Sequence, residues 1–270
     1  DRLIACAGFK IADIKSKVPI LGPYDVVAVQ ECERINNIIS SLLRTLEELV
    51  KGINGELNVT DAMEDLAKSI RWNKLPDVWN SVAGYPSKKS LNFWFEDLMR
   101  RWEQLSEWTK ELILPRAVNI TLLCAPMSFV TAIKQVTARA QGFSLDDLEI
   151  MTDVTNITED EGIKDPPTTG VLVFGMFVQG ARWEDPGSDV PGFLAEMTPK
   201  ELDPKIPYMN IFAVKGCDRN TLGYYECPVY YTTARGATYI FTAFLKMESE
   251  ESDPNKWVLA GVALILSSDE

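Results

Sequence analysis

The sequence predicts an α+β fold, in which a helical part is followed by a part built from antiparallel strands. Up to residue 112, apolar residues recur at the spacing of the buried face of a helix. The last third instead contains runs rich in Val, Ile, Tyr, Phe and Thr, which are typical of strands. Polar or Pro/Gly-rich loops, such as 158–162 and 184–191, separate the short apolar runs of this second part.

Three long helices are expected in the first part. The first extends from a cap at Asp25 to a stop at Gly52. The second starts at Thr60-Asp61, with Glu64 placed three residues after Asp61 as in a capping box. The third covers about 90–112 and is rich in tryptophan. The residues expected to face the core are Ile35, Ile38, Ile39, Leu42, Leu46 and Leu49, then Met63, Leu66, Ala67 and Ile70, then Leu91, Trp94, Leu98, Trp102, Leu105, Trp108 and Leu112.

The segments between and after these helices follow other patterns. Residues 76–79 and 86–87 predict a connecting segment with a buried tryptophan, Trp79. Pro115 ends the third helix, and the apolar, β-branched run 118–124 predicts a buried strand. Pro126 opens a helix through about Ala140. Strands are then expected over 148–154, 171–179, 209–214, 225–231, 238–246 and 256–266.

Glycines and the last strand add detail to the β part. Arg235-Gly236 provides a residue that can take a positive φ, as a hairpin turn requires. Gly175 and Gly180 are interpreted as bends or points of close packing, in preference to phosphate contacts. The run 256–266 is apolar on both faces, so we expect it to be covered on one side by a barrel interior and on the other by helices or a partner.

The composition restricts the classes of partner. The 270 residues are 46% hydrophobic and 24% charged, which is ordinary for a folded chain. The net charge of −12 makes the chain a poor partner for nucleic acid or an anionic membrane. The longest uncharged run, 117–133, contains polar residues and a proline, and is expected to form a strand and a helix rather than a membrane span.

The cysteines and the first residue bear on the context of the chain. The five cysteines are scattered and form no C-x-x-C pair, so we expect reduced thiols of an intracellular protein. The chain begins at Asp1 rather than at Met, which suggests a piece of a longer polypeptide.

Several signatures of catalytic and nucleotide-binding sites are missing from the sequence. There is no histidine, which excludes Ser-His-Asp, Cys-His and histidine-containing zinc sites. There is no Gly-Lys pair and no Gly-x-Gly, which excludes the phosphate-binding loop of nucleotide hydrolases and the Rossmann fingerprint. The acidic groups 146–147 and 159–161 are interpreted as solvated turns in preference to a cation or acid–base site. Trp94, Trp102 and Trp108 are assigned to the core, and Arg182-Trp183 to a structural role. We therefore predict no catalytic, cofactor-binding or metal-binding residue.

A series of motifs, in a fixed order and spacing, covers almost the whole chain. They are Pro76-Asp77-Val78-Trp79, Pro86-Ser87 with Lys89 and Leu91, the segment 94–108, Pro126 with Ser128-Phe129 and Thr131-Ala132, Asp153-Val154-Thr155, Gly180-Ala181-Arg182-Trp183, Cys227-Pro228-Val229-Tyr230 with Arg235-Gly236, and the segment 257–264. Together they resemble the C-terminal domain of dynein heavy chains. Residues 22–36 and 55–57 resemble the axonemal class, that of cilia and flagella, more than the cytoplasmic one. The family commonly carries an aromatic residue and a glycine where this chain has Asn119 and Leu122, which leaves the packing of that strand open.

The resemblance implies a helical subdomain over 1–115 and, over 116–270, a small incomplete antiparallel β-barrel with an inserted helix. It implies a non-catalytic terminal domain that packs on the AAA+ ATPase ring of the same heavy chain and modulates ATP-driven, microtubule-based motility. ATP and Mg²⁺ would bind in the ring, and microtubules would be bound only through other parts of the parent. The other partners would be dynein complex subunits, in the cytoplasm and in the cytoskeleton of a ciliary or flagellar axoneme, with neither nucleic acid nor membrane as a partner.

A second hypothesis of a different class is a free-standing β-barrel module that binds a peptide or a regulatory partner in a groove. It predicts that a ligand raises the thermal stability of the isolated chain. An enzyme ranks third, because the sequence offers no histidine base, metal site or phosphate loop.

Overall fold

The computed structural model describes residues 8–85, 87–163, 166–185, 187, 192–198, 203–216 and 221–267. Cys6, Pro86 and Cys217 lie outside these ranges. The helices are α2 Ile11–Lys15, α3 Pro23–Ile53, α4 Asp61–Arg71, α5 Asp77–Ala83, α6 Leu91–Glu111, α7 Pro126–Gln141 and α8 Asn255–Leu259, with short 3₁₀ turns that include η1 Ile120–Leu122. The strands are β1 Ala117–Asn119, β2 Leu148–Val154, β3 Val171–Phe174, β4 Phe177–Gln179, β5 Arg182–Glu184, β6 Phe193–Ala195, β7 Met209–Lys215, β8 Tyr224–Thr232, β9 Tyr239–Lys246 and β10 Ala263–Ser267.

The three long helices form where expected, but their starts differ in detail. Gly22 is the N-cap of α3, and its N–H donates to the side chain of Asp25 at 2.8 Å. Asp25 therefore caps the helix from inside its first turn. The N-cap of α4 is Thr60, whose hydroxyl accepts from the N–H of Met63 at 3.3 Å. The capping box expected from Glu64 is wrong, because the helix begins one residue before that pattern requires.

Two short helices occupy segments that were expected to be irregular. Residues 11–15 of the mixed N-terminal segment form α2. The connecting segment that begins at Pro76 forms α5, which ends at Gly84 with φ +72°. Trp79 of α5 is 1% exposed, and its indole N–H donates to the Thr45 hydroxyl of α3 at 2.9 Å. The buried tryptophan is thus confirmed, and α5 fixes it against α3.

The strands form two four-stranded sheets and one two-stranded sheet. Their orders are β1-β3-β7-β2, β4-β10-β8-β9 and β5-β6. The hairpin β8–β9 is confirmed, with Arg235 at φ 55° and Gly236 at φ 59° in its turn. Most pairs are antiparallel, but β1 runs parallel to β3 and β10 parallel to β8. The α+β class is confirmed.

The two larger sheets are joined at two places without closing into a barrel. At the first, the expected strand 171–179 divides at Gly175, where φ is +99°, so the chain passes from β3, an inner strand of one sheet, to β4, an edge strand of the other. At the second, between the edge strands β2 and β9, the Thr152 hydroxyl donates to the Phe244 carbonyl at 2.9 Å and accepts from its N–H at 2.7 Å. None of the sheets in the described residues is closed, so the term incomplete barrel is a loose description.

Two expected strands are shorter than predicted. In 118–124, the Asn119 side chain accepts from the N–H of Thr121 at 3.1 Å and starts the turn η1, so only Ala117–Asn119 is strand. In 256–266, the first half is the helix α8. The Asp253 side chain accepts from the N–H of Asn255 at 2.9 Å at the start of that helix, and Gly261, at φ +68°, separates it from β10.

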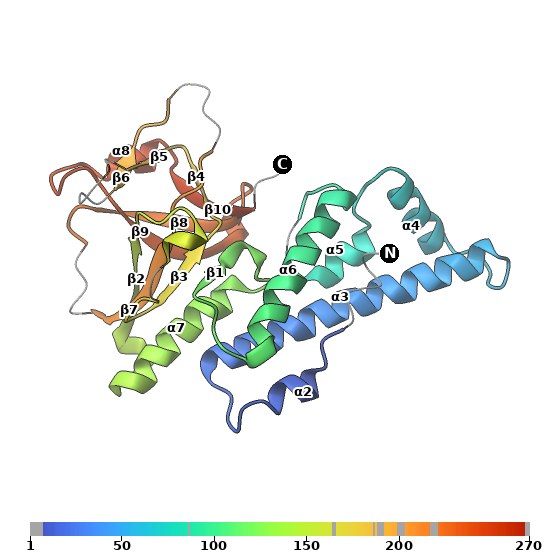
Figure 1. Ribbon diagram of the computed structural model, residues 1–270. Coiled ribbons are helices and arrows are strands. Elements are labelled where there is room, and N and C mark those ends of the chain that lie inside the picture. The colour runs from blue at the N-terminus through green and yellow to red at the C-terminus, as the bar shows by residue number, and fades with distance from the viewer. Residues whose placement is uncertain are drawn as a thin grey trace.

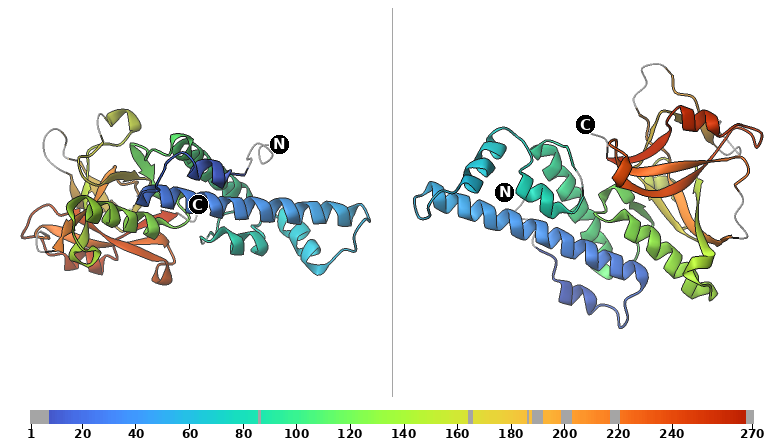
Figure 2. Two further views of the ribbon diagram at one scale, coloured as in Figure 1. Left: turned by 90° about the horizontal axis from the view of Figure 1, so that it is seen from below. Right: turned by 180° about the vertical axis from the view of Figure 1, so that it is seen from behind.

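One continuous core extends from the helices into the sheets. Figures 1 and 2 show α3 projecting far from the β part, while α7 lies between that part and the other helices. α3 contacts α4, α5, α6 and α7, and α7 contacts β2 and β7. Trp94 and Trp108 are fully buried, and Trp102 packs against the same core, which confirms their assignment. The proposed boundary between 115 and 116 stays a prediction.

The cysteines within the described residues, Cys32, Cys124 and Cys227, are buried free thiols. No helix in the described ranges is both long and apolar enough to cross a membrane.

The bend at Gly175 leads to a stability prediction. A Cβ at this position would overlap the Asn119 side-chain oxygen and lie 3.0 Å from Cγ2 of Thr121. We expect Gly175→Ala to lower the free energy of unfolding by about 2–4 kcal/mol, because overlap adds to the cost of a positive φ. Chemical unfolding in urea measures this change.

The matched control is Gly142→Ala. Gly142 also has a positive φ, +70°, but nothing lies within 4 Å of its Cβ position. It should lose only about 1 kcal/mol. Equal losses for the two variants would contradict the steric argument.

Candidate functional site

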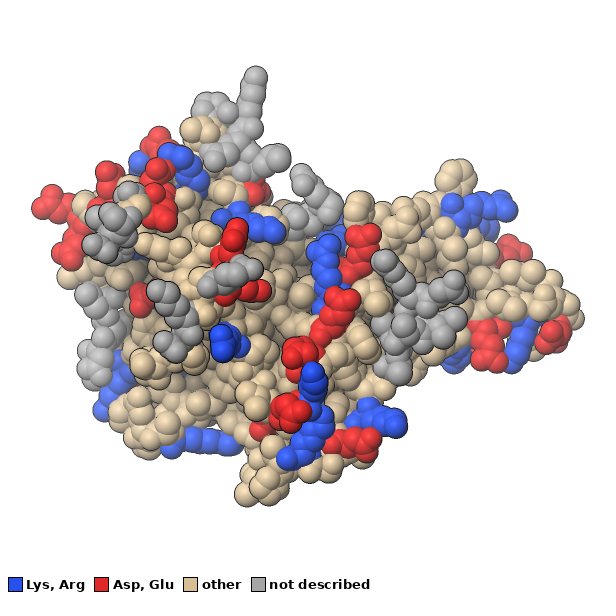
Figure 3. All heavy atoms as spheres, in the orientation of Figure 1, with Lys and Arg blue, Asp and Glu red and all other residues tan. Residues whose placement is uncertain are grey.

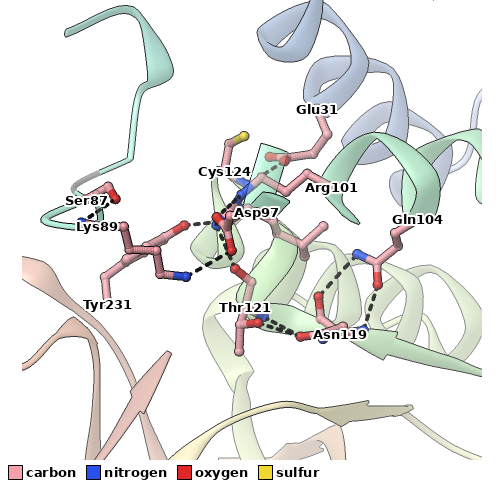
Figure 4. Close-up of polar contacts among 11 residues, drawn as sticks. Glu31, Ser87, Lys89, Asp97, Arg101, Gln104, Asn119, Thr121, Cys124 and Tyr231 are labelled. Carbon is pink, nitrogen blue, oxygen red and sulfur yellow. Dashed lines mark hydrogen bonds and ion pairs between the residues drawn. The ribbon is translucent and has the colours of Figure 1, made fainter. Parts of the chain in front are cut away.

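A group of buried charges lies where α6 meets the β part (Figure 4). We call Glu31, Lys89, Asp97 and Arg101 the junction cluster. Arg101 is 2% exposed, and its Nε donates to Oδ2 of Asp97 at 2.9 Å. Lys89 Nζ donates to the other oxygen of Asp97 at 3.1 Å. A single buried carboxylate therefore joins two cations.

Arg101 extends this contact from α6 to the following segments. Its Nη2 donates to the Thr121 carbonyl in η1 at 3.0 Å. Its guanidinium carbon lies 4.0 Å from the centroid of the Tyr85 ring, a cation–π contact. Tyr85 in turn stacks on Tyr231 of β8, with 6.2 Å between ring centroids. The Tyr231 hydroxyl donates to the Leu123 carbonyl at 3.1 Å. The guanidinium thus links α6, the α5–α6 connection and the sheet.

Glu31 of α3 holds the start of α7. Its two carboxylate oxygens accept from the N–H groups of Cys124 at 2.6 Å and Ala125 at 2.8 Å. Ala125 is the N-cap of α7, where N–H groups lack partners within the helix. A carboxylate from one helix therefore caps another, where the helix dipole favours negative charge. This contact fixes α7, and with it the sheet that α7 covers, to the long helix α3.

A reciprocal amide pair continues the same connection. The N–H of Asn119 donates to Oε1 of Gln104 at 2.9 Å, and Nε2 of Gln104 donates to the Asn119 carbonyl at 3.2 Å. The Asn119 side chain also accepts from the Thr121 hydroxyl at 2.6 Å. These contacts answer the question left open by the sequence, because Asn119 ends the short strand β1 and attaches it to α6.

Burial and neighbouring charges shift the pKa values of the carboxylates in the cluster in opposite directions. Burial acts to raise the pKa of Asp97, but Arg101 and Lys89 outweigh it, so this pKa lies below its ordinary value. Burial raises the pKa of Glu31, although its two backbone donors and Arg101 oppose the change. Burial also raises the pKa of Tyr85 and of Tyr231. The Cys124 thiol has a pKa of about 12 because it is buried beside Glu31.

This arrangement suits structural support better than catalysis. The carboxylates of Asp97 and Glu31 are occupied by cations or backbone donors, and the neighbouring tyrosine and cysteine titrate far above neutral pH. No group of three or more Cys, Asp or Glu in the described ranges is arranged to hold a metal ion. A general base needs a pKa near the working pH and access to a substrate proton.

The residues singled out in the sequence lie elsewhere. Asp146 and Asp147 are in the turn before β2. Asp160 accepts a hydrogen bond from the Tyr208 hydroxyl, while the side chain of Glu161 is outside the described residues. Arg182 of β5 lies 2.5 Å from Glu184 and donates to the Glu196 carbonyl at 3.1 Å, a structural role at the edge of the small sheet.

Sequence reasoning did not find the junction cluster, although signals for it exist. Asp97 and Arg101 stand four residues apart, a spacing that brings side chains together on a helix. Glu31 lies four residues before Ile35, on the apolar stripe of α3. A charge on a buried stripe indicates a partner, but its identity depends on the tertiary fold.

The buried carboxylate of α6 allows a test by substitution. Asp97→Asn leaves the buried Arg101 without a counter-charge, so we expect the free energy of unfolding at pH 7 to fall by about 3–5 kcal/mol. The exposed Asp65, which pairs with Lys68 at 3.4 Å on α4, provides the control Asp65→Asn, with an expected change below about 1 kcal/mol.

The loss of stability in Asp97→Asn is expected to depend on pH. The folded-state pKa of Asp97 is lowered, so its stabilising contribution is present above the unfolded-state pKa and is lost as the pH falls through the folded-state value. The urea midpoints of the wild type and Asp97→Asn should converge in acid. A difference that stays constant down to acid pH would contradict the ion-pair argument.

The capping carboxylate of α3 gives a second prediction. In Glu31→Gln, one backbone N–H would face an amide NH₂ in place of an acceptor, so we expect a loss of about 1–3 kcal/mol at pH 7. The control is Glu33→Gln, because the side chain of Glu33 is exposed on the same helix. Thermal unfolding followed by circular dichroism measures both, and no difference between them would refute the capping role.

Comparison with known proteins identifies the family. Residues 7–266 match the family model that describes the C-terminal domain of the dynein heavy chain. The chain is 39% identical over 258 residues to dynein axonemal heavy chain 9 of Homo sapiens and to the ciliary dynein beta chain of Tripneustes gratilla, which covers 96% of this chain and 6% of each relative. It is 37% identical over 264 residues to the flagellar outer arm dynein alpha chain of Chlamydomonas reinhardtii, again covering 6% of that relative. The chain thus spans a small fraction of the length of its relatives. The resemblance expected from the sequence is confirmed, and the chain belongs to the family of C-terminal domains of dynein heavy chains, of the axonemal class.

Proposed function

We propose that this chain is the non-catalytic C-terminal domain of an axonemal dynein heavy chain, which packs on the AAA+ ATPase ring and modulates ATP-driven motility along microtubules. Family membership over 96% of the chain supports the placement in the parent. The junction cluster supports the mechanical aspect of the proposal. Its buried contacts from α3 and α6 to α7, η1 and the sheet connect the helical projection with the β part, and we infer that the two move together as a rigid body.

A rigid body of this kind can act on a motor by conformational bias. α3 has 31 residues, which corresponds to a length of about 46 Å. Contacts at its two ends can therefore touch separate modules of a ring and favour the ring states in which both contacts are made. The size of the effect is limited by the difference in contact energy between those states.

The same proposal assigns the chemistry to other regions of the parent. ATP and Mg²⁺ bind in the ring, and microtubules are bound outside this chain. The net charge of −12 supports the second assignment, since the microtubule surface is itself acidic. The partners are the ring modules and the other subunits of the dynein complex, and the location is the cytoskeleton of a ciliary or flagellar axoneme.

Deleting residues 1–270 from the parent heavy chain tests the proposal. We expect nucleotide binding and ATP hydrolysis to persist, while run length, force or activation changes in single-molecule motility. Complete loss of nucleotide binding in a motor that is otherwise folded would refute the non-catalytic role.

The junction cluster allows a finer version of this test. Asp97→Asn in the parent, assayed well below its unfolding temperature, should shift motility in the same direction as the deletion, because it loosens the rigid connection. Asp65→Asn should leave motility unchanged. A motility shift after deletion but none after Asp97→Asn would show that rigidity at the junction is not what matters.

A further inference from the structure

An open cavity of about 310 Å³ lies beside the junction cluster. Its walls come from α6, from η1, from the bend between β3 and β4, and from the end of β10. It therefore opens at the boundary between the helical projection and the sheets. Figure 3 shows a band of neighbouring acidic and basic side chains across the middle of the molecule, between these two regions.

The cavity is positively charged in an acidic protein. Four basic side chains line it, those of Lys89, Arg100, Arg101 and Lys205. Two carboxylates, those of Glu96 and Asp97, face them. This local excess of positive charge contrasts with the net charge of −12 of the whole chain.

The cations of the cavity are not equally neutralised. Lys89 and Arg101 share the single carboxylate of Asp97. The second guanidinium nitrogen of Arg101, Nη1, is buried and has no hydrogen-bond partner among the described residues. Arg100 and Lys205 are exposed, and neither makes an ion pair within the described part of the chain. Lys205 Nζ lies over the Phe177 ring, 5.7 Å from its centroid, a cation–π contact that leaves the amine charged.

Apolar side chains form the remaining wall. Phe93 of α6 is 56% exposed although it is a large apolar residue. Phe177 and Leu266 line the cavity from the sheet. The volume lies at the lower end of the range of roughly 300–1,000 Å³ that is usual for small-molecule sites, and is larger than one inorganic anion needs. A ligand that fills the cavity therefore needs an apolar part as well as negative charge.

We propose that this cavity binds a small phosphorylated ligand, with its phosphate between Arg100 and Lys205 and its apolar part against Phe93. A phosphate monoester carries about −1.5 to −2 charges at pH 7, which matches two cations that have no ion pair within the described residues better than a single carboxylate does. The guanidinium of Arg100 can bind phosphate through two parallel hydrogen bonds. Glu96, on the same turn of α6 as Arg100, opposes an anion and limits its affinity.

The proposal predicts opposite effects for neighbouring substitutions. In the 270-residue chain, titration calorimetry with AMP and with inorganic phosphate, at ionic strength held constant with chloride, should detect binding of both, with AMP the tighter. The double variant Arg100→Gln, Lys205→Gln should weaken both ligands at least tenfold. Glu96→Gln should strengthen both. Phe93→Ala should weaken AMP while leaving inorganic phosphate unchanged.

A matched control removes the same two charges elsewhere. Arg71, the last residue of α4, and Lys74, which follows that helix, are exposed and do not line the cavity. Arg71→Gln, Lys74→Gln should not alter binding, and circular dichroism should show that all variants fold. Absence of binding, equal weakening in the two double variants, or citrate binding as tightly as phosphate would overturn the proposal. These outcomes leave the ring-packing function untouched, because the assay involves no ring.

Discussion

The arrangement of the molecule depends on one buried cation. Arg101 reaches from the middle of α6 to Asp97, to the Thr121 carbonyl and to the face of Tyr85, and through Tyr85 to the sheet. A buried ion pair adds little net stability compared with apolar residues of the same shape, because both charges lose their water. Asp97 and Arg101 both belong to α6, so their ion pair moves with that helix. A shift of α6 would instead break the contacts of Arg101 with the Thr121 carbonyl and of Asp97 with Lys89, and would leave buried polar groups without partners, which is costly. These contacts therefore favour the observed arrangement of helices and sheets over alternative packings.

Few direct contacts join the two large sheets of the β part. They are joined at one place by continuous backbone through Gly175 and at another by the hydroxyl of Thr152. No ladder of backbone hydrogen bonds joins the two sheets within the described residues. The covering helix α7 and the shared apolar core supply the remaining stabilisation. Because Glu31 of α3 holds the start of α7, the placement of the sheets also depends on α3.

The sequence predicts the elements whose signals are local. Apolar periodicity predicts the long helices, a proline predicts the start of α7, and an apolar run predicts the strand 148–154. The structure confirms all three. Prediction from the sequence fails where a single side chain redirects the backbone. Asn119 and Asp253 do so by accepting a hydrogen bond from the N–H two residues ahead. The candidate site was missed for a different reason. The spacing of Asp97 and Arg101 predicts their pair, but the contacts of Arg101 with Thr121 and of Glu31 with Cys124 and Ala125 join segments distant in the chain, which no local pattern identifies.

Because α3 is long, a small change of angle at the junction becomes a large displacement at the far end of the helix. Glu31 stands 22 residues before the end of the helix at Ile53, a distance of about 33 Å along the axis. A tilt of about 5° at the junction would move the far end by about 3 Å, roughly the length of one hydrogen bond. A tilt that breaks no contact at the Glu31 carboxylate would therefore be enough to make or break a contact at the far end of α3.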